Sequence, residues 1–266
     1  MPTDTLTTTA RIIDVFSSIQ GEGLYVGQPH LFVRFWDCNM TCHYCDTEYR
    51  GPFQEMSLGQ LEAKVSQLLV ERGPHEAVSL TGGEPLLWWQ FLTGFLPWLK
   101  SAGQRTYLET NGTLSQSLEA VLPWVDVIAM DLKPPSATAD RPVWREHAAF
   151  LEAAMRPATP PELFVKIVVT PETTDDDLDR AVGLLASVDR RIPLVLQPVT
   201  PPPVLPPAGA SSGRPEGPKT GGGVTPYGLV VRGPQPGLLT RWLQRARLRL
   251  DDVRVIPQIH PILGVP

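Results

Sequence analysis

Short apolar runs of β-forming residues alternate with helical patterns along most of this chain, and that alternation limits the possible folds more than any other feature. Strands are predicted at 30–36, 77–80, 105–108, 125–130, 163–169, 194–196 and 253–256, and helices at 57–71, after the loop 81–85 as far as 101, at 144–155, 173–187 and 238–247. Strands that alternate with helices in this way form parallel βα units. About six such units predict an α/β fold, an open, partial (β/α)6 parallel barrel rather than a closed barrel of eight strands.

Polar or glycine-bearing motifs stand directly after the predicted strands. They are the run 38–45 with its cysteines, TGGEP at 81–85, ETNG at 109–112, DLK at 131–133 and QP at 197–198. A parallel sheet or barrel places its active site at the carboxyl ends of its strands. Each motif could serve as a turn, but their repeated position predicts one site along that edge. Gly82 and Gly83 have no Cβ, so their backbone can approach a ligand closely.

All three cysteines of the chain lie in a single CxxxCxxC run, at Cys38, Cys42 and Cys45. A disulfide framework needs paired cysteines, and a structural zinc site usually takes four ligands from two separated pairs. Three thiolates so close together can instead ligate three irons of a [4Fe–4S] cluster and leave the fourth iron open. On this run alone, a zinc site completed by His43 and a set of buried free thiols remain alternatives.

The length of the chain, 266 residues, is one at which a single α/β barrel domain is common. We therefore predict one catalytic domain over residues 1–266. Residues 201–226 are rich in proline and glycine, a composition that cannot bury enough apolar surface to offset the entropy of ordering. This segment is predicted to be a linker or a loop insertion that lies outside the site.

Composition argues against several classes of protein. The formal net charge of −5 gives no support for a nucleic-acid-binding surface. The first residues include threonines where a signal peptide would need an apolar core, and the chain contains no run of about 18 apolar residues. We expect a cytoplasmic protein without membrane or nucleic-acid partners, in a reducing compartment that suits free thiolates.

The cysteine run, with Tyr44 before its third cysteine, resembles the cluster loop of radical S-adenosylmethionine (SAM) enzymes. The resemblance implies a [4Fe–4S] cluster on the three cysteines, with SAM chelating the open iron. The reduced cluster then cleaves SAM to a 5′-deoxyadenosyl radical, while the protein supplies positioning and excludes water. In that superfamily a GGEP-like loop also holds the methionine amino group of SAM. The implied SAM contacts are Tyr44, Gly82, Gly83, Glu84, Asn111, Lys133, Ser136 and Gln197.

Four further motifs narrow this resemblance. They are SSIQGEG at 17–23, FVR at 32–34, DT at 46–47 and QIH at 258–260. Together they resemble the 7-carboxy-7-deazaguanine synthase family over nearly the whole chain outside the linker. Members convert 6-carboxy-5,6,7,8-tetrahydropterin to 7-carboxy-7-deazaguanine by a radical ring contraction that releases ammonia, a step toward queuosine and other 7-deazapurines. The resemblance also implies that SAM is regenerated and that Mg²⁺ assists.

Three residues of these motifs suit such a substrate. A pterin presents a guanidine-like N–H and NH₂ edge, which the carboxylate of Glu22 can accept in paired hydrogen bonds. The planar guanidinium of Arg34 suits the substrate carboxylate, and the hydroxyl of Thr47 resembles the family's Mg²⁺ ligand. From the residues alone, a solvated turn, a structural ion pair and a β-turn threonine are the respective alternatives.

The family resemblance implies further substrate contacts from Gln20, Thr110, His260 and Pro266, the last through its α-carboxylate. It also implies a one-electron donor such as flavodoxin or ferredoxin, and a homodimer. Two other functions stay open. One is an activating enzyme of the glycyl-radical type, which shares the cysteine spacing but acts on a protein. The other is a zinc- or cluster-binding module without catalysis.

Overall fold

The computed structural model of this chain describes residues 9–138, 140–200, 223–224, 230–235 and 237–265. The predicted linker at 201–226 lies outside the described residues except for 223–224, so the assignment of 1–266 to one domain stays a prediction. Pro266, a predicted substrate contact, also lies outside them. Among the described residues, none of the helices combines the length and the apolar composition that crossing a bilayer would require.

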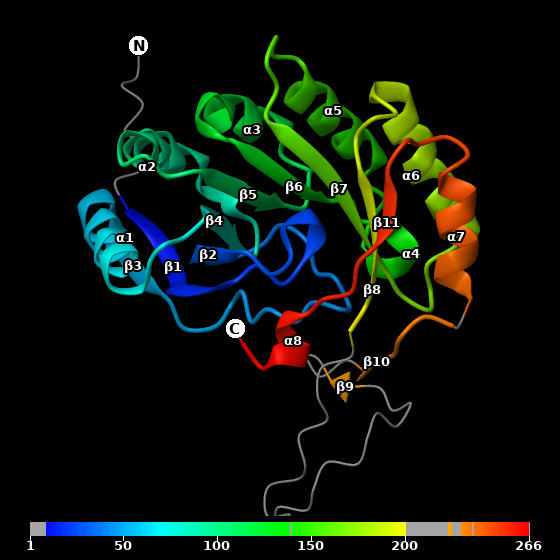
Figure 1. The fold of residues 1–266 in the computed structure, drawn as a ribbon, viewed down its shortest axis with the longest axis horizontal. Coiled ribbons are helices and arrows are strands. Elements are labelled where there is room, and N and C mark those ends of the chain that lie inside the picture. Colours follow the sequence, from blue (N-terminus) through cyan, green and yellow to red (C-terminus); the bar gives the residue numbers. More distant parts are fainter. Residues whose placement is uncertain (1–8, 139, 201–222, 225–229, 236, 266) are drawn as a thin grey trace, which may run out of the picture.

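The described residues form a curved, nine-stranded sheet in the order β11-β8-β7-β6-β5-β4-β2-β1-β3 (Figure 1). Its strands are β1 (Thr9–Ile19), β2 (Pro29–Phe35), β3 (Gln54–Ser57), β4 (Ala77–Gly82), β5 (Thr106–Thr110), β6 (Val127–Asp131), β7 (Glu162–Val169), β8 (Leu194–Pro198) and β11 (Val253–Val255). β2, β4, β5, β6, β7 and β8 run parallel to one another, and β11 adds another parallel strand. β1 and β3 pair antiparallel at the other edge. The sheet stays open between its two edges, which confirms the predicted partial parallel barrel.

Helices cover the outer face of this sheet (Figure 1). They are α1 (Leu58–Arg72), α2 (Trp89–Ser101), α3 (Ser115–Val121), α5 (Trp144–Met155), α6 (Asp175–Val188) and α7 (Leu238–Ala246), with the short α4 (Pro135–Thr138) and α8 (His260–Leu263) elsewhere. Short 3-10 turns η1 (Gly23–Tyr25), η2 (Pro85–Trp88) and η3 (Leu122–Trp124) and a small ladder of β9 (Gly223–Val224) and β10 (Val230–Val231) complete the described elements. The predicted start of α1 is confirmed, because Ser57 and Gln60 form a capping box.

The alternation of side chains in β2 shows how the fold separates the core from the site. Leu31, Val33 and Phe35 are fully buried in the main hydrophobic core, on the side that the helices cover. Phe32 and Arg34 point to the inner face of the sheet and line a cavity there. Because successive strand residues face opposite sides, one apolar run supplies both the core and a wall of the cavity.

The sequence pattern predicts neither β1 nor β3. In β1 the pairing with β2 shifts between Ile12 and Asp14, so the buried side chains of Ile12 and Val15 are three positions apart. A bulge of this kind breaks the two-residue alternation on which strand prediction depends. β3 is an edge strand of only four residues, two of them exposed, and so gives little hydrophobic signal.

Candidate active site

A cavity of about 590 Å³ opens at the carboxyl ends of the parallel strands and is lined by most of the predicted site residues. These are Gln20, Glu22, Arg34, Cys38, Cys42, Tyr44, Cys45, Thr47, Gly82, Gly83, Thr110, Asn111, Lys133, Gln197 and His260. Two predicted residues, Glu84 and Ser136, do not line it. The motifs that follow separate strands therefore converge on one site, as parallel topology requires.

A larger hollow of about 990 Å³ lies at the opposite ends of the strands, near the amino ends of β5 and β7. Its charged side chains pair with one another, as Lys100 does with Asp126 and Arg105 with Glu162. Among the described residues, the lining of the hollow contains no cysteine, and these charges are already paired at the surface. It therefore lacks the groups that could bind a metal cluster or a cofactor. The smaller cavity is therefore the candidate active site.

The loop between β2 and β3 brings all three cysteine side chains to the cavity as free thiols. Burial raises the pKa of the Cys38 thiol to about 12 and that of the Cys45 thiol to about 11. Such thiols become thiolates only when a cation replaces the proton, so cluster binding has to release protons. Deprotonation of these thiols and binding of the cluster are therefore coupled.

The spacing of the three sulfur atoms argues against a single zinc ion. Thiolates bound to one zinc at about 2.3 Å lie within about 4 Å of one another. Among the described residues, the cysteines are not in the group of possible metal ligands whose atoms lie within 4.8 Å of one another. His43 is exposed and does not line the cavity. The arrangement suits a multi-iron cluster better than the zinc site that includes His43.

Gly82 and Gly83 pack directly against the backbone that leads into the cysteine loop. A Cβ on Gly83 would lie 1.9 Å from the carbonyl oxygen of Asp37, and one on Gly82 would lie 2.2 Å from that of Phe35. The Glu84 backbone N–H also donates to the Asp37 carbonyl at 2.9 Å. Because these two glycines lack side chains, the loop that contains them can pack closely against the cysteine loop. Both glycines also line the cavity, so their backbone can approach a ligand there.

The substitution Gly83→Ala is expected to displace the cysteine loop, because neither backbone segment can yield without moving the Cys38 side chain. Overpacking of this kind costs about 1 to 3 kcal/mol, so the midpoint of thermal unfolding should fall and iron content after reconstitution should drop. Gly59→Ala is the matched control, since no atom lies within 4 Å of its Cβ position. Equal iron content and melting temperature in the Gly83 and Gly59 variants would contradict this packing role.

Glu84 joins two loops behind the cavity wall. Its fully buried carboxylate accepts the Thr110 hydroxyl at 2.9 Å and the backbone N–H of Asn111 at 2.7 Å. Burial raises the pKa of Glu84 to about 7, although these hydrogen bonds oppose the rise. The carboxylate therefore supports the loop that carries Asn111. Ser136 is similarly occupied, since its hydroxyl donates to Asp177.

Several buried polar atoms at the cavity wall have no hydrogen-bond partner within the described residues. They are the Nε of Arg34, the Oδ1 of Asp131 and both amide atoms of Gln197. Buried polar groups nearly always have partners, so their arrangement around this cavity indicates a polar ligand. SAM carries amino, carboxylate, ribose and adenine groups that match donors and acceptors of this kind.

A chain of charged side chains crosses the inner face of the sheet. The ammonium of Lys166 on β7 contacts the Glu22 carboxylate and lies 3.3 Å from Oδ2 of Asp131. The same oxygen lies 2.7 Å from Nζ of Lys133, which also donates to the Tyr44 hydroxyl at 3.2 Å. Lys166 and Asp131 were not among the predicted site residues. The signal for Lys166 was available, because it is the one charge inside the apolar run 163–169.

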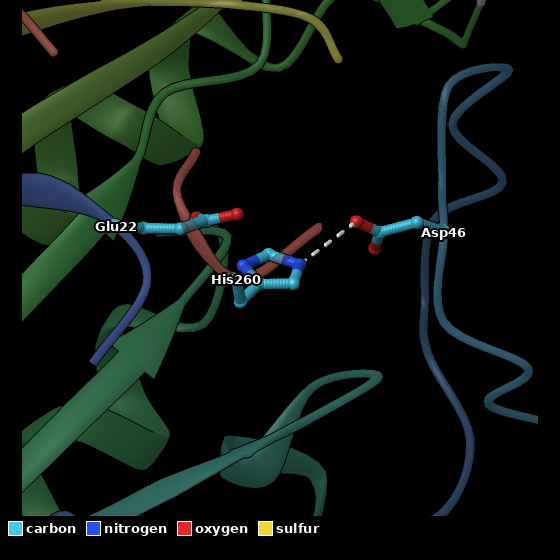
Figure 2. Close-up of side chains that lie close together, drawn as sticks. All are labelled: Glu22, Asp46 and His260. Carbon is cyan, nitrogen blue, oxygen red and sulfur yellow. Dashed lines mark ion pairs between the residues drawn. The ribbon is translucent and has the colours of Figure 1, made fainter. Parts of the chain in front are cut away.

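Figure 2 shows a second cluster, in which the side chains of Glu22, Asp46 and His260 approach one another from different parts of the chain. Nε2 of His260 lies 3.7 Å from Oδ2 of Asp46, and the amide of Gln258 donates to both carboxylates. The Ile259 backbone N–H donates to the Gly21 carbonyl at 2.9 Å. The segment 258–260 therefore forms the cavity wall beside Glu22.

This second cluster sets the charges around the substrate side of the cavity. Burial lowers the pKa of His260, but the hydrogen bond to Asp46 and the charge of Glu22 outweigh it and raise that pKa overall. Burial raises the pKa of Asp46, but His260 and Lys166 outweigh it and lower that pKa overall. The carboxylates of Asp46 and Glu22 thus lie beside a ring whose pKa is raised, an arrangement suited to a ligand with both donors and acceptors.

Comparisons with known proteins identify the family of this chain. The model of the radical SAM superfamily matches residues 37–185. The 7-carboxy-7-deazaguanine synthase of Geobacter sulfurreducens is 40% identical, over 96% of this chain and 97% of its own. Those of Methanothermobacter thermautotrophicus and Archaeoglobus fulgidus are 35% and 30% identical, over 73% and 96% of this chain and 83% and 99% of theirs. A superfamily match over more than half the chain, with two of these relatives aligned nearly end to end, means that this chain belongs to the 7-carboxy-7-deazaguanine synthase family of radical SAM enzymes.

Proposed function

We propose that this protein converts 6-carboxy-5,6,7,8-tetrahydropterin to 7-carboxy-7-deazaguanine with release of ammonia, a step toward queuosine and other 7-deazapurines. The observation that carries the proposal is that Glu22, Arg34 and His260 face the same cavity as the three cysteines. A carboxylate, a guanidinium and an imidazole in one cavity complement the guanidine-like edge and the carboxylate of this pterin. The family assignment supplies the reaction.

The substrate half of the cavity is proposed to bind the pterin between two charged groups. Glu22 is held by Gln258 at one oxygen and by Lys166 at the other, so its remaining lone pairs are aimed and ready to accept the pterin edge. Arg34 lies over the Phe16 ring, with its guanidinium carbon 5.4 Å from the ring centroid, and its Nε is free for the substrate carboxylate. Gln20, Thr110, His260 and Pro266 are proposed as further contacts.

The cofactor half is proposed to hold the cluster on Cys38, Cys42 and Cys45, with SAM beside it. When bound, the reduced cluster and SAM supply the 5′-deoxyadenosyl radical. The chain's own residues position SAM and exclude water: the loops at 82–84 and 111 approach it from one side, and Gln197 is proposed to bind it through its unpaired amide. Tyr44, Lys133 and Ser136 complete the proposed SAM contacts, with Ser136 requiring a shift from its present position.

Mg²⁺ is proposed to bind beside the substrate carboxylate, with the Thr47 hydroxyl as a ligand. Hard cations prefer oxygen donors and are often held by few protein ligands. The Thr47 hydroxyl lies 3.4 Å from Oδ1 of Asp46, a second oxygen donor at the same place. Arg34 approaches the same hydroxyl at 3.5 Å, so metal and guanidinium would hold one substrate carboxylate together.

The substitution Thr47→Val is expected to remove most of the stimulation of turnover by Mg²⁺, because valine keeps the shape of threonine but lacks the oxygen. Loss of one such ligand should reduce apparent Mg²⁺ affinity roughly 10-fold or more. Thr47→Ser is the matched control and should respond to Mg²⁺ like the wild type. The measurement is initial rate against Mg²⁺ concentration after chelation, and an unchanged response of the valine variant would rule out this ligand.

Other features of the family are proposed without contacts of their own. Turnover needs a one-electron donor, and flavodoxin or ferredoxin is the proposed class. A homodimer and a cytoplasmic location are proposed on the same basis. Light scattering of the purified protein tests the dimer, and turnover with a reconstituted flavodoxin system in place of a chemical reductant tests the donor.

The decisive experiment is an anaerobic incubation of reconstituted protein with SAM, a reductant and the carboxytetrahydropterin. Mass spectrometry should find 7-carboxy-7-deazaguanine and ammonia, with little net consumption of SAM. A brown protein that cleaves SAM but leaves the pterin unchanged would favour the glycyl-radical activating reading. A colourless protein that retains zinc and no iron would favour a binding module.

A further inference from the structure

Lys166 occupies a position that the proposed chemistry does not use directly. It lies in the middle of β7, and its side chain is only 13% exposed. Its ammonium contacts the carboxylates of Glu22 and Asp131, which come from different segments of the chain. Burying an ammonium is costly unless carboxylates compensate it, and here two do. Burial alone would lower its pKa, but Asp131 and Glu22 together raise it, so Lys166 remains a cation.

The contact with Glu22 fixes that carboxylate. One oxygen of Glu22 accepts from Gln258 and the other from Lys166, so the rotation of the carboxylate is fixed before a ligand enters. A carboxylate whose plane is already fixed can accept two parallel hydrogen bonds from a ligand. A freely rotating carboxylate loses conformational entropy when it binds the same ligand. The orientation of Glu22 therefore depends on Lys166.

Lys166 is in turn fixed from the cofactor side. Oδ2 of Asp131 is shared between Lys166 at 3.3 Å and Lys133 at 2.7 Å. Lys133 lies over the Tyr44 ring, with Nζ 5.1 Å from its centroid, and also donates to the Tyr44 hydroxyl. Tyr44 stands next to Cys45. An unbroken series of contacts thus runs from the cysteine loop, through Tyr44, to the Glu22 carboxylate.

We propose that Lys166 is a positioning residue that sets the orientation of Glu22 and thereby determines selectivity for the 2-amino edge of the pterin. The inference rests on the proposed function. Without Lys166, the Glu22 carboxylate can rotate out of the plane that accepts two donors, so the pterin loses its advantage over a 2-oxo analogue, whose carbonyl would otherwise face that carboxylate. Lys166 acts through Glu22 and needs no contact with the substrate.

The test compares Lys166→Met with Lys166→Arg, in the wild-type chain and in a Glu22→Gln background. Losing a hydrogen bond to a charged group corresponds to roughly a 10- to 150-fold change, so Lys166→Met should raise the KM for the pterin by that factor. Lys166→Arg keeps the cation and should recover most of the loss. In the Glu22→Gln background, Lys166→Met should add less than about threefold, because contacts that act in series are not additive.

Selectivity between the two substrates distinguishes a positioning role from a purely structural one, because a loss of stability alone would not change the selectivity ratio. The ratio of kcat/KM for the pterin to that for its 2-oxo analogue should fall at least about tenfold in Lys166→Met. Iron content and the thermal unfolding midpoint are measured on every variant, and Lys166→Gln replaces the Met variant if that one loses its cluster.

The outcomes separate the two proposals. Wild-type protein that cannot turn over the pterin overturns the proposed function and this inference with it. Wild-type turnover combined with an unchanged KM and an unchanged selectivity ratio in Lys166→Met and Lys166→Gln overturns this inference alone. So does an undiminished effect of Lys166→Met in the Glu22→Gln background, because Lys166 would then act independently of Glu22.

Discussion

Alanine at Cys38, Cys42 or Cys45 is expected to abolish SAM cleavage in each of the three single variants. The chain has three cysteines, so no spare thiol can replace a lost ligand. A cluster held by two thiolates is also exposed to loss of iron, because thiolates are the ligands that hold such clusters. The measurements are iron and sulfide content after anaerobic reconstitution, together with 5′-deoxyadenosine formed from SAM under reducing conditions.

His43→Ala is the matched control for this prediction. The residue lies inside the same run, between two of the cysteines, but it is exposed and does not line the cavity. The alanine variant should therefore keep wild-type iron content and SAM cleavage. Loss of bound metal in His43→Ala would favour the zinc alternative. SAM cleavage that survives in any cysteine variant would contradict the assignment of all three cysteines as cluster ligands.

Arg34→Ala is expected to cause the largest loss among the substrate contacts. Removing one partner of a buried charge pair costs about 2 to 5 kcal/mol, or a 30-fold to several-thousand-fold loss in kcat/KM for the pterin. Arg34 should be near the upper end, because the substrate carboxylate would be left without its guanidinium. Glu22→Gln should be milder, since an amide keeps one acceptor. Slow formation of 5′-deoxyadenosine without pterin should persist in both.

Arg11→Ala is a suitable control for the loss of an arginine on the neighbouring strand β1. The Arg11 guanidinium lies over the adjoining rings of Trp36 and Phe53, 5.0 and 4.9 Å from their centroids, and it does not line the cavity. Its removal should leave pterin turnover within about twofold, apart from a small loss of stability. If Arg34→Ala turned over the pterin as well as Arg11→Ala does, the substrate assignment of Arg34 would fail.

The parts of the site that follow strands could be predicted from the sequence because of parallel topology. Asn111 and Lys133 follow β5 and β6, Gln197 lies near the carboxyl end of β8, and each lines the same cavity. No knowledge of tertiary contacts is needed for this, since parallel strands place their carboxyl ends at one edge. The capping box at Ser57 is equally local, which is why the start of α1 is confirmed.

The parts that depend on distant pairing could not be predicted. Lys166 and Glu22 are 144 positions apart, and nothing in either segment identifies the other as its partner. Glu84 stands in a motif that predicts a cofactor contact, yet its carboxylate turns back to Asn111 and away from the cavity. The bulge at Ile12 hid β1 for a different reason, because it disrupts the periodicity that predicts strands.

The hydrogen bond between Gln258 and Glu22 joins residues 236 positions apart, whereas the three cysteines lie within one short loop. Closing such a long loop is entropically costly, so contacts of this separation are expected to form late in folding. Pulsed hydrogen exchange during refolding should find the Ile259 amide protected after the amides of β4 and β5. A partly folded chain whose cysteine loop had formed could already bind iron before Gln258 had fixed the Glu22 carboxylate. Newly made protein is therefore expected to pass through a stage that holds iron but cannot yet turn over the pterin.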